Sequence, residues 1–327
     1  MLNKVQKVAF QFIQSDARFL YTLVDMQNHA IEGNYLSMCL PYIGIFAHES
    51  EQWGRKAKIE SPNFTKDEKE YYTKIRQAHK LLELSYEEYE AKIIGQLKKS
   101  DEYFCSVRSV IEKIFGYRNM GTDYYQSSFC GNTILIASYL PFDYLKDLDS
   151  GKEIYIFSKS AGKLAAFYMD SSISAYHYGD TKIKYKDYHF YDKCPLKLKN
   201  NLGLVLFCIL CSINYVTIFI DRCITEETPQ KFKYAYLQYY YLCQFIHELN
   251  QCNNTKFYIN DSLCDRALRN CFAHYGLGQL LKEEDIIEED ILKGLTQKVF
   301  DMDYFSCKEK LYEYLEDFKK QIEEMIF

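Results

Sequence analysis

The chain has 327 residues, of which 48% are hydrophobic and 26% are charged, and its formal net charge at pH 7 is −5. This composition is typical of a folded globular protein with a sizeable core. The negative charge argues against a surface coated in cations for long nucleic acids, although a local phosphate site needs only a few basic side chains. With 5 prolines and 14 glycines, the chain has little room for linkers.

The 12 cysteines are scattered through apolar stretches with helical spacing. The opening residues, MLNKVQKVAFQFIQSD, lack the long apolar core of a signal peptide, so we expect a cytoplasmic protein with reduced, buried thiols. Cys208 and Cys211 form one CxxC pair without a second pair or a histidine at ligand spacing, which favours core packing over a zinc or redox site. We therefore expect neither a metal nor another cofactor.

Residues 1–116 have apolar side chains three and four positions apart, which predicts a helical region. Ser85 and Asp101 are good N-cap residues for two of its helices, and Pro41 is expected to kink another. The sequence does not indicate a role for this region.

Residues 117–200 change character, because glycines separate short runs. Residues 153–158 and 163–169 are predicted strands, and residues 181–191 alternate with a period of two. The segment is therefore predicted to be a small β element or an irregular insertion. Lysines alternate with aromatic residues across 181–200, which favours a solvated edge hairpin, with contact to single-stranded RNA as the alternative.

Residues 201–327 are predicted to form a helical bundle, with helices at 201–223, 228–251, 261–281 and 303–326. The run 202–220 is nearly long enough to cross a membrane, but Ser212, Asn214 and Thr217 interrupt it. We expect a central helix buried on all sides and no membrane contact. The predicted fold is mainly α, with an N-terminal helical region at 1–116, an insertion at 117–200 and the bundle at 201–327.

The helix predicted at 261–281 carries Arg269, Asn270 and His274 among apolar residues. Asn270 and His274 are four positions apart and share a face, and the long side chain of Arg269 can reach the same groove. The expected N-caps are Asn260, Asp261 and Ser262, and the expected helix end is at Gly276 or Gly278.

The segment RNCFAH, residues 269–274, resembles the Rx4–6H motif of the HEPN superfamily. Members of that superfamily are small helical bundles, and many are metal-independent ribonucleases. The resemblance covers the C-terminal bundle and implies an endoribonuclease that cleaves single-stranded RNA by attack of the 2′-OH, as a toxin or antiphage defence effector. It also implies a homodimer with a composite active site and an antitoxin or other regulatory partner.

The chemistry of these residue types fits that activity. Attack of a 2′-OH on the adjacent phosphate needs a base, an acid and charge stabilisation, and it does not require a metal. His274 can transfer the proton near neutral pH, Arg269 can stabilise the negative phosphorane, and Asn270 can orient either partner. One motif offers one histidine, so a two-fold dimer is expected to supply the second proton-transfer group unless the N-terminal region does so.

Three further residues are candidates for substrate contact or for support of the site. Tyr275 follows His274 and is expected to stack on a base or position the phosphate, while His247 and Glu248 lie on the preceding helix. In superfamily toxins that a nucleotidyltransferase antitoxin controls, a modified tyrosine stands two places after the histidine. Gly276 occupies that place here, so we do not expect control by that route.

Two other interpretations stay open. The first is a catalytically inactive HEPN-like module that binds RNA, a nucleotide or a partner protein. The second is a purely structural helical scaffold in which Arg269 and His274 form a buried polar pair with a neighbour such as Asp221 or Glu248.

Overall fold

The computed structural model describes residues 2–29, 33–140, 150–169, 172–288 and 290–327. In this part of the chain the fold is mainly helical with one small three-stranded antiparallel sheet, which confirms the predicted fold class. In chain order the elements are α1 (Lys4–His29), α2 (Tyr35–Met38), α3 (Leu40–Ala57), α4 (Lys66–Ile75), the 3-10 helix η1 (Arg76–Glu83), α5 (Tyr86–Val107), α6 (Val110–Ile114), β1 (Met120–Tyr125), β2 (Ser128–Asn132), α7 (Thr133–Tyr139), α8 (Ser150–Tyr168), β3 (Lys184–Tyr188), α9 (Asn201–Asn214), the π-helical turn η2 (Tyr215–Ile220), α10 (Asp221–Cys223), α11 (Pro229–Asn253), α12 (Arg266–His274), η3 (Leu277–Gln279), η4 (Glu283–Asp285), α13 (Ile291–Phe300) and α14 (Tyr304–Ile326).

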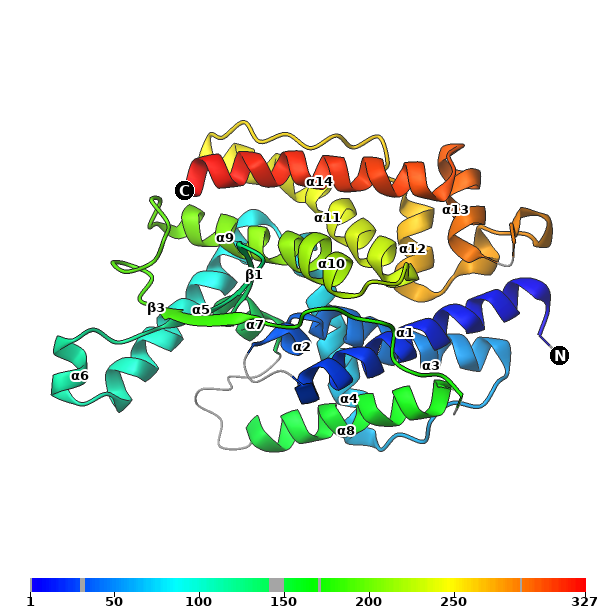
Figure 1. The fold of residues 1–327 in the computed structure, drawn as a ribbon, viewed down its shortest axis with the longest axis horizontal. Coiled ribbons are helices and arrows are strands. Elements are labelled where there is room, and N and C mark those ends of the chain that lie inside the picture. Colours follow the sequence, from blue (N-terminus) through cyan, green and yellow to red (C-terminus); the bar gives the residue numbers. More distant parts are fainter. Residues whose placement is uncertain (1, 30–32, 141–149, 170–171, 289) are drawn as a thin grey trace.

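The long helices lie in layers (Figure 1). Helices α9, α11 and α14 pack on one another on one side, and α1, α3, α4 and α8 pack together on the other. Helix α11 contacts α1, α5 and η1 as well, so it joins the two sides. The short helix α12 packs against both α11 and α3, and this places its residues where the two sides meet.

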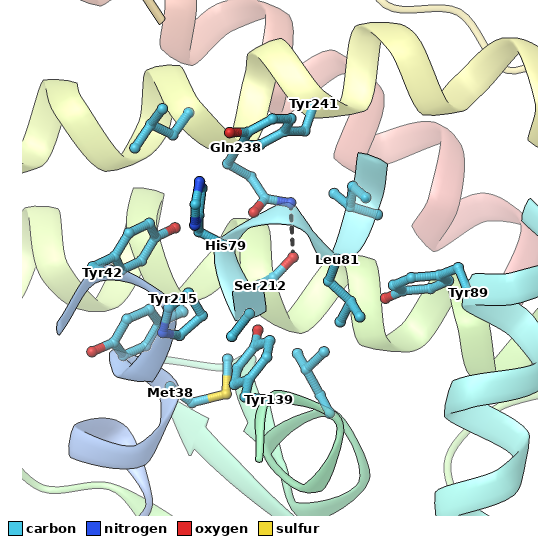
Figure 2. A pocket seen from close by; sticks show the side chains of 15 residues that line it. Met38, Tyr42, His79, Leu81, Tyr89, Tyr139, Ser212, Tyr215, Gln238 and Tyr241 are labelled. Atoms are coloured by element: carbon cyan, nitrogen blue, oxygen red, sulfur yellow. Dashed lines mark hydrogen bonds between the residues drawn. The ribbon is translucent and has the colours of Figure 1, made fainter. Parts of the chain in front are cut away.

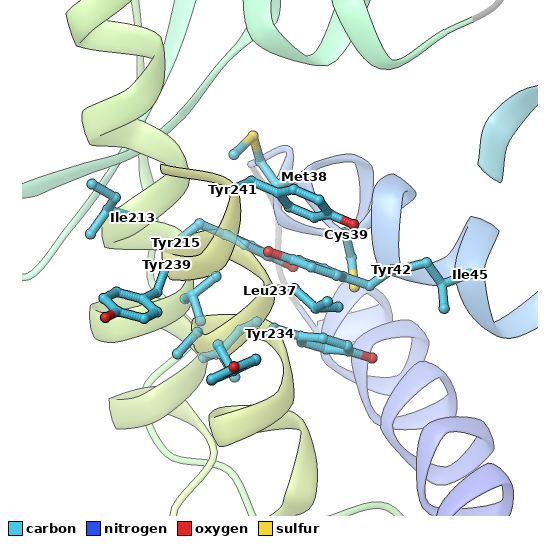
Figure 3. Close-up of a cluster of buried hydrophobic side chains, with 14 of the residues drawn as sticks. Met38, Cys39, Tyr42, Ile45, Ile213, Tyr215, Tyr234, Leu237, Tyr239 and Tyr241 are labelled. Carbon is cyan, nitrogen blue, oxygen red and sulfur yellow. The ribbon is translucent and has the colours of Figure 1, made fainter. Parts of the chain in front are cut away.

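Buried side chains from 1–116, 117–200 and 201–327 belong to one hydrophobic cluster. Figure 3 shows its tyrosine-rich centre, where the rings of Tyr42 and Tyr234 stack with centroids 3.9 Å apart. The Tyr215 hydroxyl donates to the backbone oxygen of Tyr35 at 2.7 Å. Tyr215 is tolerated in this core because its ring is buried while its hydroxyl reaches a hydrogen-bond acceptor.

The apolar run 202–220 lies in a continuous helix from Asn201 to Cys223. The helix is long and apolar enough to cross a membrane, but 89% of its most apolar stretch is buried in the protein. Its polar side chains donate hydrogen bonds: Ser212 and Thr217 donate to backbone oxygens four or fewer residues earlier in the helix, and Asn214 Nδ2 donates to the carbonyl of Phe129 in β2. This agrees with the predicted central buried helix.

The sheet has the order β2-β1-β3, and both pairs are antiparallel. The alternation at 181–191 correctly indicated β3, which is an edge strand. The predicted strands at 153–158 and 163–169 are wrong, because these residues lie in α8. The buried side chains of α8 are three or four residues apart, which is a helical period, at Ser160, Ala161, Leu164, Ala165 and Tyr168. Packing against α1 and α4 outweighs the strand preference of the local aromatic and β-branched residues.

Two helix-boundary predictions within 1–116 also need correction. Ser85 caps α5 as predicted, in a capping box with Glu88. Asp101 does not begin a helix but lies inside α5, where its carboxylate accepts a hydrogen bond from Asn119 Nδ2 and helps to hold the start of the sheet. Pro41 does not kink a helix either, since it lies in the first turn of α3, where a missing N–H has no cost.

Candidate active site

Helix α12 is shorter than predicted, because tertiary contacts end it on both sides. The hydroxyl of Tyr236 donates to the backbone oxygen of Leu263 at 2.9 Å and holds the preceding loop out of the helix. Asp265 is the N-cap, with its side chain accepting from Leu268 N. At the other end Tyr275 adopts a left-handed conformation with φ of 50°. The caps predicted at 260–262 and the end predicted at Gly276 or Gly278 are therefore wrong.

The two faces of α12 differ in burial. Its buried side chains are Leu268, Cys271, Phe272 and Ala273. Arg269, Asn270 and His274 are half-buried and lie on the remaining surface of the helix. The shared face predicted from the spacing is thus present, and it meets α3 and η1 of the same chain.

His274 is held by a carboxylate from α3. Its Nδ1 lies 3.1 Å from Glu49 Oε2, and a second histidine, His48, places its own Nδ1 2.9 Å from Glu49 Oε1. Arg76, the first residue of η1, pairs with Glu49 through Nε at 2.5 Å, and its Nη2 lies 3.3 Å from His274 Nδ1. We call these four residues, His48, Glu49, Arg76 and His274, the Glu49 cluster.

The Glu49 carboxylate is 6% exposed but remains charged. Burial alone would raise the pKa of Glu49. Hydrogen bonds from His274 and His48 and the charge of Arg76 outweigh that effect and hold the pKa well below its usual range. When His274 Nδ1 carries the proton it donates to the charged Glu49, and Arg76 Nη2, which can only donate, then makes no hydrogen bond to that nitrogen. In this tautomer Nε2 is the nitrogen that can exchange a proton with a substrate.

Arg269 lies on the same side of α12 and is paired with η1. Its guanidinium forms an ion pair with Glu83 and donates to Asn270 Oδ1 at 2.9 Å. The group lies over the ring of Tyr241, with 5.1 Å between Cζ and the ring centroid. Burial, and then the charge of Arg76, lower the pKa of Arg269. Because the ordinary pKa of an arginine is very high, the side chain stays cationic.

Cations outnumber carboxylates around this face. Arg76, Lys80 and Arg269 supply three positive charges, whereas Glu49 and Glu83 supply two negative ones. Lys80 Nζ lies 2.9 Å from Glu83 Oε2, and its pKa is lowered by burial and then by the charges of Arg269 and Arg76. A phosphate bound here would relieve the repulsion among the three cations.

His79 lies on the inner side of η1 and lines a small cavity of about 40 Å³ (Figure 2). Burial, with the charges of Arg76, Lys80 and Arg269, lowers the pKa of His79 to about 3. Among the described residues neither His79 Nε2 nor the Tyr241 hydroxyl has a hydrogen-bond partner. The cavity is large enough for a water molecule but too small for a nucleotide. His79 is therefore neutral near pH 7 and is not a proton-transfer group of this site.

The other predicted site residues lie elsewhere. Tyr275 is 1% exposed and its hydroxyl donates to the buried Asp16, so stacking on a substrate base is ruled out in this conformation. His247 is exposed and bonds to Gln251, and Glu248 accepts from Tyr86 N at the start of α5. These contacts tie His247 and Glu248 to other parts of the surface, so the prediction that they support Arg269 or His274 is wrong.

The partners that the sequence analysis missed come from the N-terminal region. Glu49 and Glu83 bind the histidine and the arginine, in place of the suggested Asp221 or Glu248. Glu49 follows an apolar run in α3 at a buried position, and a charged residue there was the one available signal. Arg76 and Glu83 are the first and last residues of η1. No local sequence pattern marks them as site residues, since their role depends on where η1 packs.

The Glu49 cluster yields a pH-dependent prediction. Because the pKa of Glu49 is lower in the folded chain than its ordinary value near 4.5, its stabilising effect is full above pH 4.5 and declines as the pH falls further. At pH 7, Glu49→Gln is expected to lower the free energy of unfolding by about 2 kcal/mol, and the difference from wild type is expected to shrink at pH 3. Urea unfolding of both proteins at pH 7 and at pH 3 measures these differences in the free energy of unfolding.

The control for this prediction is Glu284→Gln, which removes a carboxylate that is 71% exposed. We expect it to leave the stability unchanged at both pH values. A Glu49→Gln deficit that is equally large at pH 3 and pH 7 would contradict the assignment of a charged, hydrogen-bonded Glu49.

Within the described part of the chain, no group of three His, Cys, Asp or Glu side chains is arranged to hold a metal ion. Comparisons with protein-family models, curated proteins and solved structures found no match for this chain. A function proposed for the site therefore rests on its geometry and chemistry and on the motif at residues 269–274.

Proposed function

We propose that this chain is a metal-independent endoribonuclease that cleaves single-stranded RNA, with the α12 face as its active site. The observation that carries the proposal is a half-exposed histidine, His274, held at Nδ1 by the buried Glu49 beside two arginines. A carboxylate that fixes one ring nitrogen and leaves the other available is the arrangement that general acid–base catalysis requires. The resemblance of residues 269–274 to the HEPN motif points to the same activity.

The proposed reaction is a transesterification. The 2′-oxygen of the substrate forms a bond to phosphorus as its proton passes to a base, and the bond from phosphorus to the 5′-oxygen breaks as an acid protonates that oxygen. His274 transfers one of these protons, Arg269 stabilises the phosphorane, and Asn270 orients the Arg269 guanidinium through their hydrogen bond. The products are a 2′,3′-cyclic phosphate and a 5′-hydroxyl.

The second proton-transfer group has two candidates. The family resemblance implies that a homodimer supplies it from a second copy of the motif. Within the chain, His48 binds the opposite oxygen of Glu49 and its side chain is 20% exposed. His48 would supply the second imidazole without a dimer, as expected if the N-terminal region substitutes for a partner subunit.

The ion pair between Arg269 and Glu83 bears on regulation. A substrate phosphate that binds Arg269 must compete with Glu83 for the same guanidinium. We propose that a regulatory partner or trigger that moves η1 raises the activity of the chain, in keeping with a cytoplasmic toxin or antiphage effector. A catalytically inactive module that binds RNA, a nucleotide or a protein is the alternative.

The proposal is tested with a mixed-sequence single-stranded RNA and the DNA of the same sequence, both in EDTA. We expect cleavage of the RNA alone, with cyclic phosphate ends, and no cleavage at a position where one 2′-deoxynucleotide replaces a ribonucleotide. Cleavage of the DNA, or RNA cleavage only when Mg²⁺ is restored, would contradict the proposed chemistry. Binding of the RNA without cleavage would favour the inactive module.

A further inference from the structure

A second site lies on the small sheet, apart from the α12 face. A cavity of about 580 Å³ is bounded by one face of β1 and β3 and by α9 and α14, and its lining shares no residue with the Glu49 cluster. Its volume falls within the range of small-molecule binding sites in proteins. We propose that this cavity binds a nucleotide, with the base against its aromatic wall and the phosphate on two lysines; this inference does not depend on the ribonuclease proposal.

The register of the strands explains how cations and aromatic rings come to share one face. Lys184, Lys186 and Tyr188 are alternate residues of β3, so their side chains lie on the same side of the sheet, and all three line the cavity. On the neighbouring strand, Tyr124 pairs with Lys184, and Thr122 pairs with Lys186. The lysines are exposed and Tyr188 is half-buried. A planar base and an anionic phosphate need these two side-chain types together.

Asn214 is the residue that distinguishes this face from an ordinary sheet edge that carries lysines. Lysines protect many exposed edge strands from aggregation, so Lys184 and Lys186 alone would indicate no ligand. Asn214 lines the same cavity and is 1% exposed. Its Nδ2 donates to the carbonyl of Phe129 at 3.0 Å, which fixes the orientation of the amide, yet among the described residues Oδ1 accepts no hydrogen bond.

A buried acceptor without a donor is costly, and a ligand N–H group would satisfy Oδ1 if the cavity wall shifts to admit it, because the atom itself is almost fully covered in this structure. Every nucleobase has such a group on its pairing edge. Asn214 is also the last residue of α9 before the π-helical turn η2, and π-helical turns occur frequently at functional sites.

Charge at the cavity favours an anion. Lys184 and Lys186 are opposed by one side-chain carboxylate in the lining, Glu323, and burial raises the pKa of Glu323. The Lys186 ammonium lies 5.1 Å from the centroid of the Tyr188 ring, so the cation and the aromatic surface are adjacent. In the proposed complex, one nucleotide places its phosphate on the lysines and its base toward Asn214.

The inference is tested by calorimetric titration of the full chain with AMP and with a 2′-O-methyl hexaadenylate, which cannot undergo 2′-OH attack. Binding of AMP indicates a site for a free nucleotide, and binding of the oligomer alone indicates a site for one nucleotide of a strand; either result supports the inference. Ribose 5-phosphate has the phosphate but lacks the base, so we expect it to bind about tenfold more weakly than AMP, or worse.

Variants assign any binding to this cavity. Lys184→Ala/Lys186→Ala is expected to raise the Kd about tenfold or more, whereas Lys182→Ala/Lys197→Ala removes the same charge from exposed positions outside the lining and should leave the Kd unchanged. Arg269→Ala alters the other site and should leave the Kd for AMP unchanged. Absence of binding by both probes, equal binding of ribose 5-phosphate, or equal effects of the two lysine pairs would overturn the inference.

Discussion

Replacing His274 with alanine is expected to reduce RNA cleavage in EDTA by about 100- to 10,000-fold, which is the usual contribution of a positioned acid or base. The side chain is 33% exposed, so its removal opens no large cavity in the core. The loss should appear in kcat, because the imidazole moves a proton in the transition state and contributes little to binding of the substrate. Single-turnover cleavage of a labelled RNA measures it.

Two variants make this result specific. His274→Gln keeps a polar side chain of similar reach but cannot transfer a proton, so we expect it to be as inactive as His274→Ala. His247→Ala removes an exposed histidine of α11 whose ring bonds to Gln251, and it should cleave at the wild-type rate. A folded His274→Ala protein with wild-type activity would refute the assignment of the α12 face as the active site.

Lys233→Met is expected to lower the free energy of unfolding by about 3–5 kcal/mol, because it leaves a buried carboxylate without its partner. Lys233 Nζ lies 2.5 Å from Asp16 Oδ2, and both side chains are 1% exposed. Burial lowers the pKa of Lys233, and the Asp16 charge opposes that effect. Asp16 also accepts hydrogen bonds from Gln230, Tyr234 and Tyr275. Urea unfolding followed by circular dichroism measures the loss.

A double variant and a surface pair provide the comparison. Asp16→Asn/Lys233→Met retains an acceptor for the neighbouring hydroxyls and buries no charge, so it should be more stable than Lys233→Met alone. Asp317 and Lys320 form an equivalent pair, with a separation of 3.2 Å, in which both side chains are more than half exposed. Lys320→Met should change the stability by less than about 1 kcal/mol. Equal losses for Lys233→Met and Lys320→Met would contradict the role of burial.

The buried pair also supports the candidate site. Tyr275 follows His274 directly, and its hydroxyl joins Asp16 and Lys233 in one network. The network therefore anchors the last turn of α12 to α1 and α11, next to the histidine. This explains why Tyr275 adopts a left-handed backbone although a glycine follows it: the ring must enter the core, and a glycine has no side chain to do so.

Local sequence signals correctly predicted those helix caps and strand faces that depend only on residues a few positions apart. Ser85 and Glu88 form a capping box by their spacing alone, and the alternation around Lys184 and Lys186 sets the two faces of β3. The same kind of signal placed Asn270 and His274 on one face of a helix. The local signal was misleading in α8, because its apolar residues are compatible with both a strand and a helix. Packing against α1 and α4 decides in favour of the helix.

By itself, the sequence determined that the chain is mainly helical, that the run 202–220 is a core helix, and that Asn270 and His274 share a face that Arg269 can reach, because hydrophobic period and side-chain spacing are local properties. Only the tertiary structure decided which charges meet that face. Glu49 and Arg76 lie about 200 residues from His274 along the chain, and contacts over such separations depend on how the helices pack. For the same reason, the unpaired oxygen of Asn214 becomes visible only once the sheet covers α9.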